Sequence, residues 1–552
     1  MTKPLFAPPP MLDLTPAPLR RRALGLALAL LVAAAVGARA DDATPPAPPA
    51  PPPASGAAPA PAAGIVVKGF KFAGNASVPT ADLERLLAPY TGKTADLAKL
   101  REAADRVSEE YQRRGLDLAR AYIPAQTIQD GVVEIDVLEG RLGEVRVSGN
   151  QTYDTGLIRG FIQAAVTGTA VTTEGLEHGL LLLSDFKDLK VTASLDRGAA
   201  PGTVDVDAKA EDGFPVHGGL SFNNFGSDYT SRYHFGADLD WENALLPGAI
   251  LSLSGMIGDR PDRIAFGGGT YLVPVNDLGT RVGVSASYGN FQVAEDLAIL
   301  GIHGEEWEVG AFVTHPLIRT RTLSIWGDVG FQLKDAKFYL LSQVSSHDKI
   351  RSVYATVHGE HLGLGGRDVG SFSVSQGLGD FLDGTHGDDP QASRFGADDT
   401  YTRLSAQYGR LQPLSDLFAL SGRAGGQWTT DSLLSSEEWQ VGGADSVRGF
   451  APAESSGDYG YLASLEFHVS PLEDQALLQF LAFIDHGGAF RKRELPGQKD
   501  HSYLTGTGLG VRSHFEWHVK GDLRLELGWP LTPVRNTLDE APVIYAAVSI
   551  RL

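Results

Sequence analysis

From residue 214 to the end of the chain, apolar and polar side chains alternate with a period of two, and this pattern limits the fold more than any other feature. Successive side chains of a β-strand point to opposite faces, so the pattern predicts strands with one apolar and one polar face. The apolar face of one such strand carries Tyr233, Phe235, Ala237, Leu239 and Trp241. The same alternation returns at 461–470 and 522–529. Residues 214–552 are therefore predicted to be all β.

Sixteen stretches of this kind follow one another. They are 215–223, 232–242, 248–257, 262–273, 280–290, 305–316, 321–334, 349–360, 368–378, 400–410, 416–428, 459–469, 477–487, 504–513, 521–529 and 543–552. An even number of strands, each about ten residues long, is typical of barrels that cross an outer membrane. The last stretch has an apolar face that can close against the first. We therefore expect a 16-stranded antiparallel outer-membrane β-barrel in contact with lipid.

The connections between these stretches alternate in length. Those after the even-numbered stretches are short, such as Asn243–Pro247 and Leu411–Ser415, whereas most of those after the odd-numbered stretches are longer, such as 379–399 and 429–458. Short turns on one side and long loops on the other are typical of membrane barrels. The long loops are expected outside the cell, opposite the N-terminal domains. A soluble β-sandwich or propeller with unusually regular turns is the alternative.

The N-terminus has the features of an export signal, predicted to be residues 1–40. Arg20–Arg22 form a basic region, Ala23–Val36 an apolar run, and Ala38-Arg39-Ala40 a small-residue cleavage site. An uncleaved anchor helix is the alternative. Residues 43–63 are almost entirely Pro and Ala, and residues 41–63 are predicted to be an extended linker.

Composition excludes several classes of function. The chain has no cysteine, which rules out disulfides and Cys-based metal sites. Its net charge of −20 argues against nucleic acid as a partner, because phosphate binding needs a basic face. We found no catalytic, phosphate-binding or metal-binding motif, so we expect no enzyme activity, no cofactor and no metal. His386 lies among several aspartates, which we interpret as an acidic, solvated loop.

Residues 64–213 contain two copies of one small α/β unit. The pairs Gly74-Asn75 and Gly149-Asn150 are 75 residues apart and each ends a short alternating strand. The first copy is predicted to be residues 64–140, with a strand, two helices and two strands at 65–72, 80–87, 96–114, 119–123 and 131–138. The second is predicted to be residues 141–213, with the same elements at 142–147, 154–164, 173–185, 189–195 and 203–208.

One loop motif and one strand motif stand out in the β half. The loop after the eleventh predicted strand contains Val447-Arg448-Gly449-Phe450, and a later strand contains Phe483, Asp485 and Gly487 in the order Phe-x-Asp-x-Gly. Taken alone, the loop is compatible with a Gly-rich hairpin carrying a stray arginine. Together the two motifs resemble the signatures of the superfamily of outer-membrane barrels with POTRA (polypeptide-transport-associated) domains.

That resemblance implies a specific contact. In the superfamily the loop folds back into the barrel and its arginine pairs with the strand aspartate, which here means Arg448 with Asp485. A guanidinium can bind a carboxylate through two parallel hydrogen bonds. Shielding from water inside a lumen strengthens such a pair. Gly449 would allow a tight loop tip, and Phe450 would pack beside it.

The N-terminal half narrows the resemblance to two-partner secretion transporters, the haemolysin secretion/activation family. The motif residues that carry it are Gly74, Asn75, Pro124, Gln126, Glu139 and Gly140. The resemblance covers residues 65–552 and makes the two α/β units POTRA domains. Residues 43–63 are too rich in proline to form the plug helix that this family often has.

The resemblance implies a protein translocator in the cell outer membrane with its POTRA domains in the periplasm. Its expected partners are a large secreted β-helical exoprotein of the adhesin or haemolysin kind, outer-membrane lipid and, during biogenesis, the barrel-assembly machinery. The exoprotein would be recognised by the POTRA domains and cross the barrel unfolded, without nucleotide. The alternatives are an assembly or insertion factor of the same superfamily, and a porin or receptor.

Overall fold

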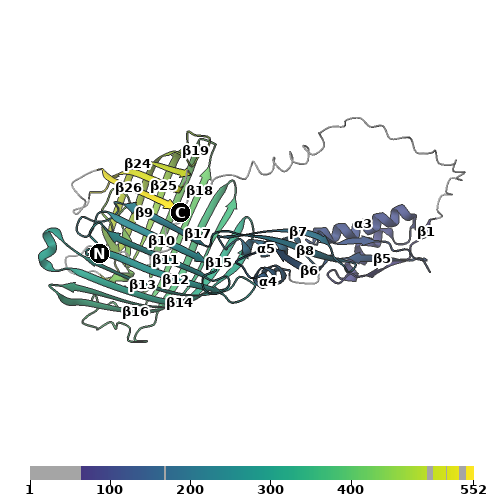
Figure 1. Ribbon diagram of the computed structural model, residues 1–552, viewed down its shortest axis with the longest axis horizontal. Helices are drawn as coiled ribbons and strands as arrows, with labels where there is room; N and C mark the ends of the chain where they lie inside the picture. Colours follow the sequence, from purple (N-terminus) through teal and green to yellow (C-terminus); the bar gives the residue numbers. More distant parts are fainter. Residues whose placement is uncertain (1–63, 167–169, 494–500, 517–518, 534–541, 552) are drawn as a thin grey trace.

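In the computed structural model the chain forms a barrel with an arm of two small α/β units at one end (Figure 1). The structure describes residues 64–166, 170–493, 501–516, 519–533 and 542–551. The predicted signal sequence and linker lie outside these residues. Among the described residues, no helix is long and apolar enough to span a membrane.

The first unit is a three-stranded sheet covered by two helices. Its elements are β1 (Ile65–Val66), β2 (Gly69–Ala73), α2 (Thr80–Leu87), η2 (Ala88–Tyr90), β3 (Thr94–Ala95), α3 (Leu97–Arg113), β4 (Arg120–Tyr122) and β5 (Val132–Leu138). The sheet order is β2-β5-β4, with β2 and β5 parallel. Leu100, Ala104, Val107 and Tyr111 form the buried stripe of α3, as the helical spacing of apolar residues predicts.

One prediction for this unit is wrong. The opening strand expected at 65–72 is two strands, and β1 pairs with β3 instead of joining the main sheet. The backbone N–H of Val67 bonds to Lys93 and that of Lys68 to Gly131, so the chain changes partner there. Two residues of β3 give too little alternation to be found by pattern.

The second unit repeats the plan of the first. Its elements are β6 (Arg141–Ser148), α4 (Thr155–Ala165), α5 (Thr173–Leu183), β7 (Leu189–Arg197) and β8 (Thr203–Asp212). The sheet order is β6-β8-β7, again with the first and last strands of the unit parallel. The repeat extends to single bonds. The Asn75 amide donates to the carbonyl of Val78 and to Thr80, and the Asn150 amide donates to the carbonyl of Tyr153 and to Thr155.

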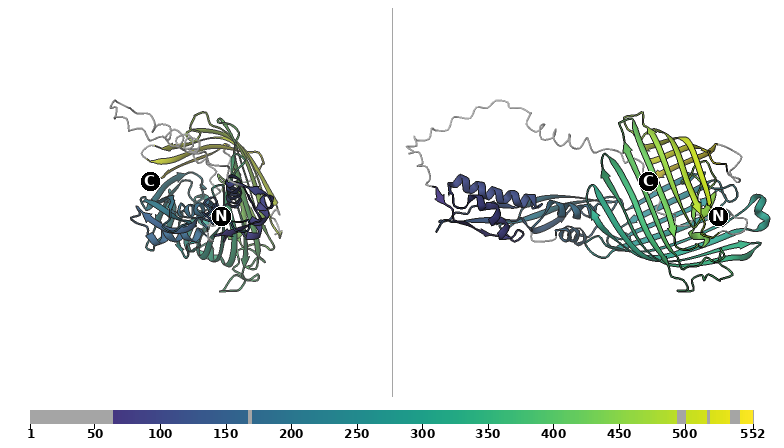
Figure 2. Two further views of the ribbon diagram at one scale, coloured as in Figure 1. Left: turned by 90° about the vertical axis from the view of Figure 1, so that its right-hand side faces the viewer. Right: turned by 180° about the vertical axis from the view of Figure 1, so that it is seen from behind.

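The remaining strands form a closed barrel of sixteen strands. They are β9 (Val216–Asn223), β10 (His234–Glu242), β11 (Ile250–Gly258), β12 (Ile264–Pro274), β13 (Arg281–Gln292), β14 (His303–Arg319), β15 (Leu323–Leu340), β16 (Gln343–Gly363), β17 (Gly366–Gly377), β18 (Thr402–Pro413), β19 (Phe418–Thr429), β22 (Tyr459–Val469), β23 (Gln479–Phe490), β24 (His501–Glu516), β25 (Lys520–Pro530) and β26 (Val543–Arg551). Every neighbouring pair is antiparallel, and β26 pairs with β9 to close the ring. Figure 2 shows the ring of strands from two further sides.

The main correction in the barrel concerns β15 and β16. A long loop was predicted between them at 335–348, but these strands run on to Leu340 and from Gln343, with only Leu341 and Ser342 between them. Both turn residues have positive φ. This two-residue hairpin lacks the Asn-Gly or Gly signal of such turns, which is why the sequence did not reveal it.

Three short elements lie in the long loops. They are η3 (Glu295–Leu300) between β13 and β14, and η4 (Ser435–Glu437) and the hairpin of β20 (Trp439–Val441) with β21 (Ser455–Gly457) between β19 and β22. η4 and the β20–β21 hairpin belong to residues 430–458, which we call the returning loop.

The inner and outer faces of the barrel follow the sequence alternation. On β15, Val329 has 63% of its surface exposed and points outward with Phe331 and Leu333, whereas Asp328, Gln332 and Lys334 alternate with them and point inward. The outer face is therefore apolar and the lumen polar, as a tilted membrane strand requires.

The second α/β unit is docked on the short-turn end of the barrel. Arg319, at the end of β14, binds Asp185 through Nε at 3.1 Å and Nη2 at 2.7 Å. Lys187 pairs with Asp240 near the end of β10, and the Arg281 guanidinium lies 4.9 Å from the ring centroid of Phe186. The long loops are consequently at the end of the barrel that faces away from the arm (Figure 1).

Candidate functional site

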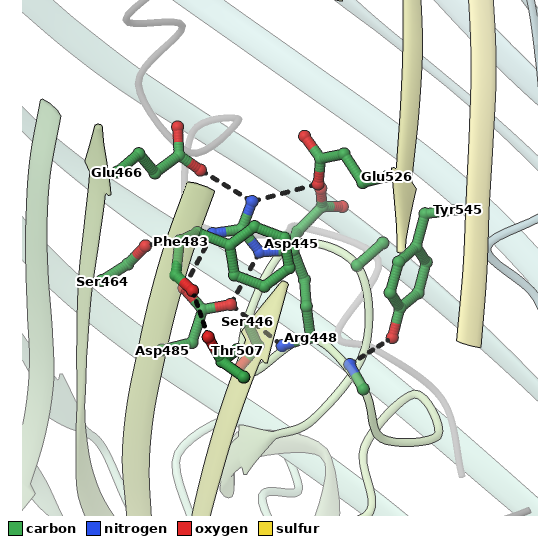
Figure 3. Close-up of polar contacts among 12 residues, drawn as sticks. Asp445, Ser446, Arg448, Ser464, Glu466, Phe483, Asp485, Thr507, Glu526 and Tyr545 are labelled. Atoms are coloured by element: carbon green, nitrogen blue, oxygen red, sulfur yellow. Dashed lines mark hydrogen bonds and ion pairs between the residues drawn. The ribbon is translucent and has the colours of Figure 1, made fainter. Parts of the chain in front are cut away.

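The returning loop folds back into the barrel and places Arg448 against the inner wall (Figure 3). The side chain of Arg448 has no exposed surface. Its Nε and Nη2 donate to the two carboxylate oxygens of Asp485 on β23, at 2.6 and 2.8 Å, and its backbone N–H donates to the same carboxylate at 3.1 Å. The expected pair is therefore present as a bidentate, fully buried contact, the strong form of an arginine–carboxylate bond.

Two further carboxylates hold the same guanidinium. Arg448 Nη1 lies 2.7 Å from Glu466 on β22 and 3.0 Å from Glu526 on β25. Arg512 on β24 joins these two glutamates, at 3.0 Å to Glu466 and 2.7 Å to Glu526. The tip of the loop is thus tied to three strands of the wall at once. A buried charge is tolerable only when it is paired and hydrogen-bonded in this way.

The backbone of the loop tip is held as closely as its side chain. Gly449 has φ of +95°, and a Cβ there would lie 2.7 Å from the backbone of Trp529. The Gly449 N–H donates to the hydroxyl of Tyr545 at 2.9 Å, and that hydroxyl donates to the Phe450 carbonyl at 3.2 Å. A Cβ at Gly506 would lie 1.9 Å from the Arg448 carbonyl, so a side chain there would displace the tip.

The apolar residues of the two motifs support the tip. Val447 and Phe450 are fully buried in one cluster, whose other buried members are Val441, Leu462, Ala489 and Leu504. Phe483 lies under the guanidinium, with Arg448 Cζ 3.4 Å from its ring centroid. A Cβ at Gly487 would lie 3.0 Å from the Val447 side chain, which explains the small residue there.

The motif residues of the first α/β unit hold that unit together. Glu139, 2% exposed, accepts bonds from the Tyr111 hydroxyl at 2.9 Å and from the N–H and hydroxyl of Ser77 at 2.7 and 2.9 Å. Burial and the bond to Glu139 raise the pKa of Tyr111, so its phenol stays protonated as the donor. Glu139 therefore joins α3 to the turn before α2.

The other motif residues shape turns and one strand edge. The side-chain amide of Gln126, two residues after Pro124, pairs with both backbone groups of Glu134 at 2.7 and 2.8 Å and so extends the sheet beside β5. Gly74 and Gly140 have positive φ, and a Cβ at Gly74 would lie 2.3 Å from the Val137 carbonyl. These residues explain the fold of the unit, and none of them touches the loop site.

We expect Glu139→Ala to destabilise the first α/β unit by about 1–3 kcal/mol, because it leaves the buried hydroxyl of Tyr111 without its acceptor and removes the two bonds that Ser77 donates. Limited proteolysis of the full-length protein in detergent, with cleavage sites read by mass spectrometry, should show faster cutting within residues 64–140. Glu134→Ala is the matched control, because the Glu134 side chain is 38% exposed and forms a surface ion pair with Lys71. Equal cutting rates for the two variants would contradict the role of Glu139.

Several residues of the site carry no motif signal. Glu466, Arg512, Glu526 and Tyr545 appear in the sequence only as polar or aromatic members of alternating strands. The alternation of inward and outward side chains along β22 and β25 would have been enough to predict that Glu466 and Glu526 face the lumen. Their convergence on Arg448 depends on the register between strands, which the sequence alone does not give.

Three features define the class of this protein, which is the outer-membrane barrels that handle polypeptides. They are the closed sixteen-stranded barrel, the loop that an arginine holds in the lumen, and the arm of two repeated α/β units. A family model described as haemolysin secretion/activation protein ShlB/FhaC/HecB matches residues 202–513, more than half of the chain, and a model described as POTRA domain, ShlB-type, matches residues 65–140. The chain therefore belongs to the ShlB/FhaC/HecB family of haemolysin secretion/activation proteins. It is an outer-membrane transporter of two-partner secretion.

Individual relatives agree with this assignment. The heme/hemopexin transporter protein HuxB of Haemophilus influenzae is 27% identical over 452 residues, which cover 79% of this chain and 78% of that protein. The outer membrane transporter CdiB of Dickeya dadantii is 24% identical, with 82% and 80% covered.

Solved structures show the same fold. CdiB from Escherichia coli superposes with a TM-score of 0.73 at 20% identity, covering 91% of this chain and 93% of that one. BamA from Haemophilus ducreyi lacking POTRA domains 1–3 gives a TM-score of 0.52 at 12% identity, with 89% and 100% covered.

Proposed function

We propose that this transporter recognises one large secreted exoprotein in the periplasm through its POTRA domains and passes it unfolded through the barrel lumen. The observation that carries the proposal is the buried Arg448 loop tip. A loop tied to three strands inside a polar lumen occupies the path at rest and has to give way to a passing chain. The proposal includes an adhesin- or haemolysin-like, β-helical partner, outer-membrane lipid around the barrel, and the barrel-assembly machinery during biogenesis.

Recognition in the periplasm is supported by the free strand edges of the arm. β4 and β2 are the edges of the first sheet and β7 is an edge of the second. An extended segment can add to such an edge through backbone hydrogen bonds, which needs little sequence specificity. Beside the first sheet lies an apolar hollow lined by Ile65, Leu97, Leu100, Ile123 and Pro124, suited to apolar side chains of an added segment.

The proposal includes export that uses no nucleotide as an energy source. We propose that the protein has no enzymatic activity of its own and that folding of the exoprotein outside the cell biases its movement outward. The polar inner face keeps the path wet, so an unfolded backbone can stay hydrogen-bonded to water as it passes.

Deletion of residues 65–140 is expected to abolish capture of the exoprotein and to leave the barrel able to form a pore. Capture is measured by co-purification with the N-terminal domain of the co-expressed exoprotein, and pore formation by conductance in planar lipid bilayers. Capture at the wild-type level by the deletion variant would contradict recognition by the first POTRA domain.

A point variant separates recognition from folding. Leu97 lines the hollow and is 52% exposed, so we expect Leu97→Asp to weaken capture without unfolding the domain. Val132, 43% exposed on the same domain, does not line the hollow, and Val132→Asp should bind normally. Equal loss in both variants would indicate general damage to the domain.

An assembly or insertion factor is the second candidate, favoured by the seam of the barrel. Among the described residues, β26 and β9 share five residue pairs, from Ala547↔Asn223 to Arg551↔Gly219, and Asn224 adds bonds to Ala546 and Ile544, whereas β9 and β10 share eight pairs. A short seam opens more easily toward lipid, which insertion of a client strand requires. Cross-linking β26 to β9 by a cysteine pair would stop insertion, whereas export through the lumen would continue.

A further inference from the structure

A second buried charge cluster holds the base of the returning loop, far from Arg448. Glu437, in η4, accepts a bond from Lys334 Nζ at 2.8 Å, lies 3.4 Å from the Tyr401 hydroxyl and pairs with Arg403. Lys334 is 3% exposed and Glu437 4% exposed. We call Glu437, Lys334, Arg403 and Tyr401 the base cluster, and Arg448 with Asp485, Glu466 and Glu526 the tip cluster.

The two clusters bind the returning loop to different parts of the wall. The base cluster involves β15 (Lys334) and β18 (Arg403), and the tip cluster involves β22 (Glu466), β23 (Asp485) and β25 (Glu526). Lys334 and Glu526 are eight strand steps apart in the ring of sixteen, whereas Arg403 and Glu466 are two steps apart. The returning loop is therefore tied to the wall at both ends and forms a bridge inside the lumen.

A neighbouring loop fastens the base of the bridge. The loop at 378–401, between β17 and β18, carries Arg394, which pairs with Asp458 and with Glu438 at 3.1 Å and donates to the Leu433 carbonyl at 2.6 Å. Ser393 N–H donates to Asp348 on β16 at 2.8 Å. The two loops also share a buried apolar cluster, consisting of Ile350, Ala397, Tyr401, Leu433 and Leu434.

These contacts are made inside the barrel. On β16, Asp348 and Ile350 are buried while Val353 and Val357, of opposite parity, are exposed on the outer face. Because side chains of one parity share one face, Asp348 and Ile350 point into the lumen. The part of the 378–401 loop that carries Ser393 and Arg394 therefore contacts the lumen side of β16 and the returning loop, whereas Phe381, Leu382 and Asp383 contact side chains of the outward parity, namely Phe331, Arg351 and Lys349.

The tip is held by more carboxylates than the base. The Arg448 guanidinium binds Asp485, Glu466 and Glu526. At the base, Lys334 and Arg403 share the single carboxylate of Glu437 that the returning loop supplies. Within the part of the chain that the structure describes, buried polar atoms without a hydrogen-bond partner occur near both ends: the hydroxyls of Ser432 and Ser436 and Nε of Arg403 at the base, and Nε of Arg524 beside the tip.

We infer that the base of the returning loop, held by the base cluster and by the loop at 378–401, is the releasable end of the bridge, and that the lumen opens when this end separates from the loop at 378–401 and from the wall while the tip stays docked. The inference rests on the proposed export path, since it assigns the step that clears the path. In this inference, Arg394 and Glu437 are positioning residues that hold the base of the returning loop in place.

The absence of cysteine in the chain permits a direct test with the full-length protein. The Ser393 hydroxyl accepts a bond from the Ser435 N–H at 2.9 Å, so Ser393→Cys with Ser435→Cys ties the loop at 378–401 to the base of the bridge on oxidation. The matched control is Thr356→Cys with Ser373→Cys, a pair in hydroxyl contact at 2.8 Å between β16 and β17, which ties two wall strands. The probe is K⁺ and Cl⁻ conductance in planar lipid bilayers.

Oxidation of the Ser393–Ser435 cysteine pair is expected to remove the openings to the large-conductance state, and reduction is expected to restore them. The oxidised control should open like the wild type. Openings that persist in the oxidised variant, with cross-linking verified by mass spectrometry, would overturn the inference. Export itself is not measured, so failure here differs from failure of the proposed function.

A second variant tests whether weaker contacts at the base of the returning loop increase the frequency of opening. Arg394→Gln combined with Glu437→Gln breaks the ion pairs of Glu437 with Lys334 and Arg403 and those of Arg394 with Asp458 and Glu438, and leaves the tip intact, so more frequent openings are expected. Openings at the wild-type frequency in this variant would equally overturn the inference.

Discussion

Replacement of Arg448 by alanine is expected to stop export of the exoprotein while leaving the barrel assembled in the outer membrane. The substitution removes the cation that pairs with the fully buried Asp485 and one of the cations that pair with Glu466 and Glu526, which keep Arg512. Breaking a buried pair by removing one partner costs about 3–5 kcal/mol, so the docked loop should lose more than about a hundredfold in population. The readouts are the amount of exoprotein in the medium and the heat-modifiable mobility of the barrel.

Two controls isolate the role of Arg448. Arg410 pairs with Asp368 between β18 and β17 and touches no residue of the returning loop, so Arg410→Ala should export normally. Arg448→Lys keeps the charge but cannot form the bidentate contact, and an intermediate yield is expected. Export at the wild-type level by Arg448→Ala would remove the function assigned to the loop tip.

The second large effect is expected from a charge on the outer face of the barrel. Val329 is on the outer face of β15, in the half of the strand nearer the short turn that joins β14 to β15. Val329→Arg therefore places a cation in the bilayer. On the lipid face of a barrel this costs about 2–4 kcal/mol near the midplane. We expect little folded barrel in the outer membrane, measured as loss of the heat-modifiable band.

Gln332→Arg is the matched control on the same strand. Gln332 points to the lumen, beside the carboxylate of Glu308, so an arginine there stays wet and paired. This variant should assemble in normal amounts. Equal assembly of both variants would mean that Val329 does not face lipid.

The barrel could be predicted in considerable detail from the sequence. The alternation has an exact period of two, and a one-residue error would place every side chain on the wrong face, so strand positions and faces are strongly determined. β22 was predicted at its observed bounds, 459–469. The loop motif and the strand motif also identified Arg448 and Asp485, because each motif is short and contiguous.

What the sequence did not reveal depends on contacts between distant segments. Glu466, Glu526 and Tyr545 meet the loop tip only through the register of β22, β25 and β26. Glu437 meets Lys334 across 103 residues, and nothing in the local sequence around either residue predicts the other. The hairpin turn at Leu341 and Ser342 was missed because neither residue is typical of a turn with positive φ.

Site-directed spin labelling along β15 distinguishes side chains that face lipid from side chains that face a wet lumen, and the full-length chain has no cysteine of its own to label. Single labels at 328, 329, 331, 332 and 333 in liposomes would be compared for collision with oxygen, which is enriched in lipid, and with a water-soluble nickel complex. The account predicts high oxygen accessibility at 329, 331 and 333 and high nickel accessibility at 328 and 332. Uniform accessibility to the nickel complex at all five positions would contradict a membrane-embedded barrel with a polar lumen.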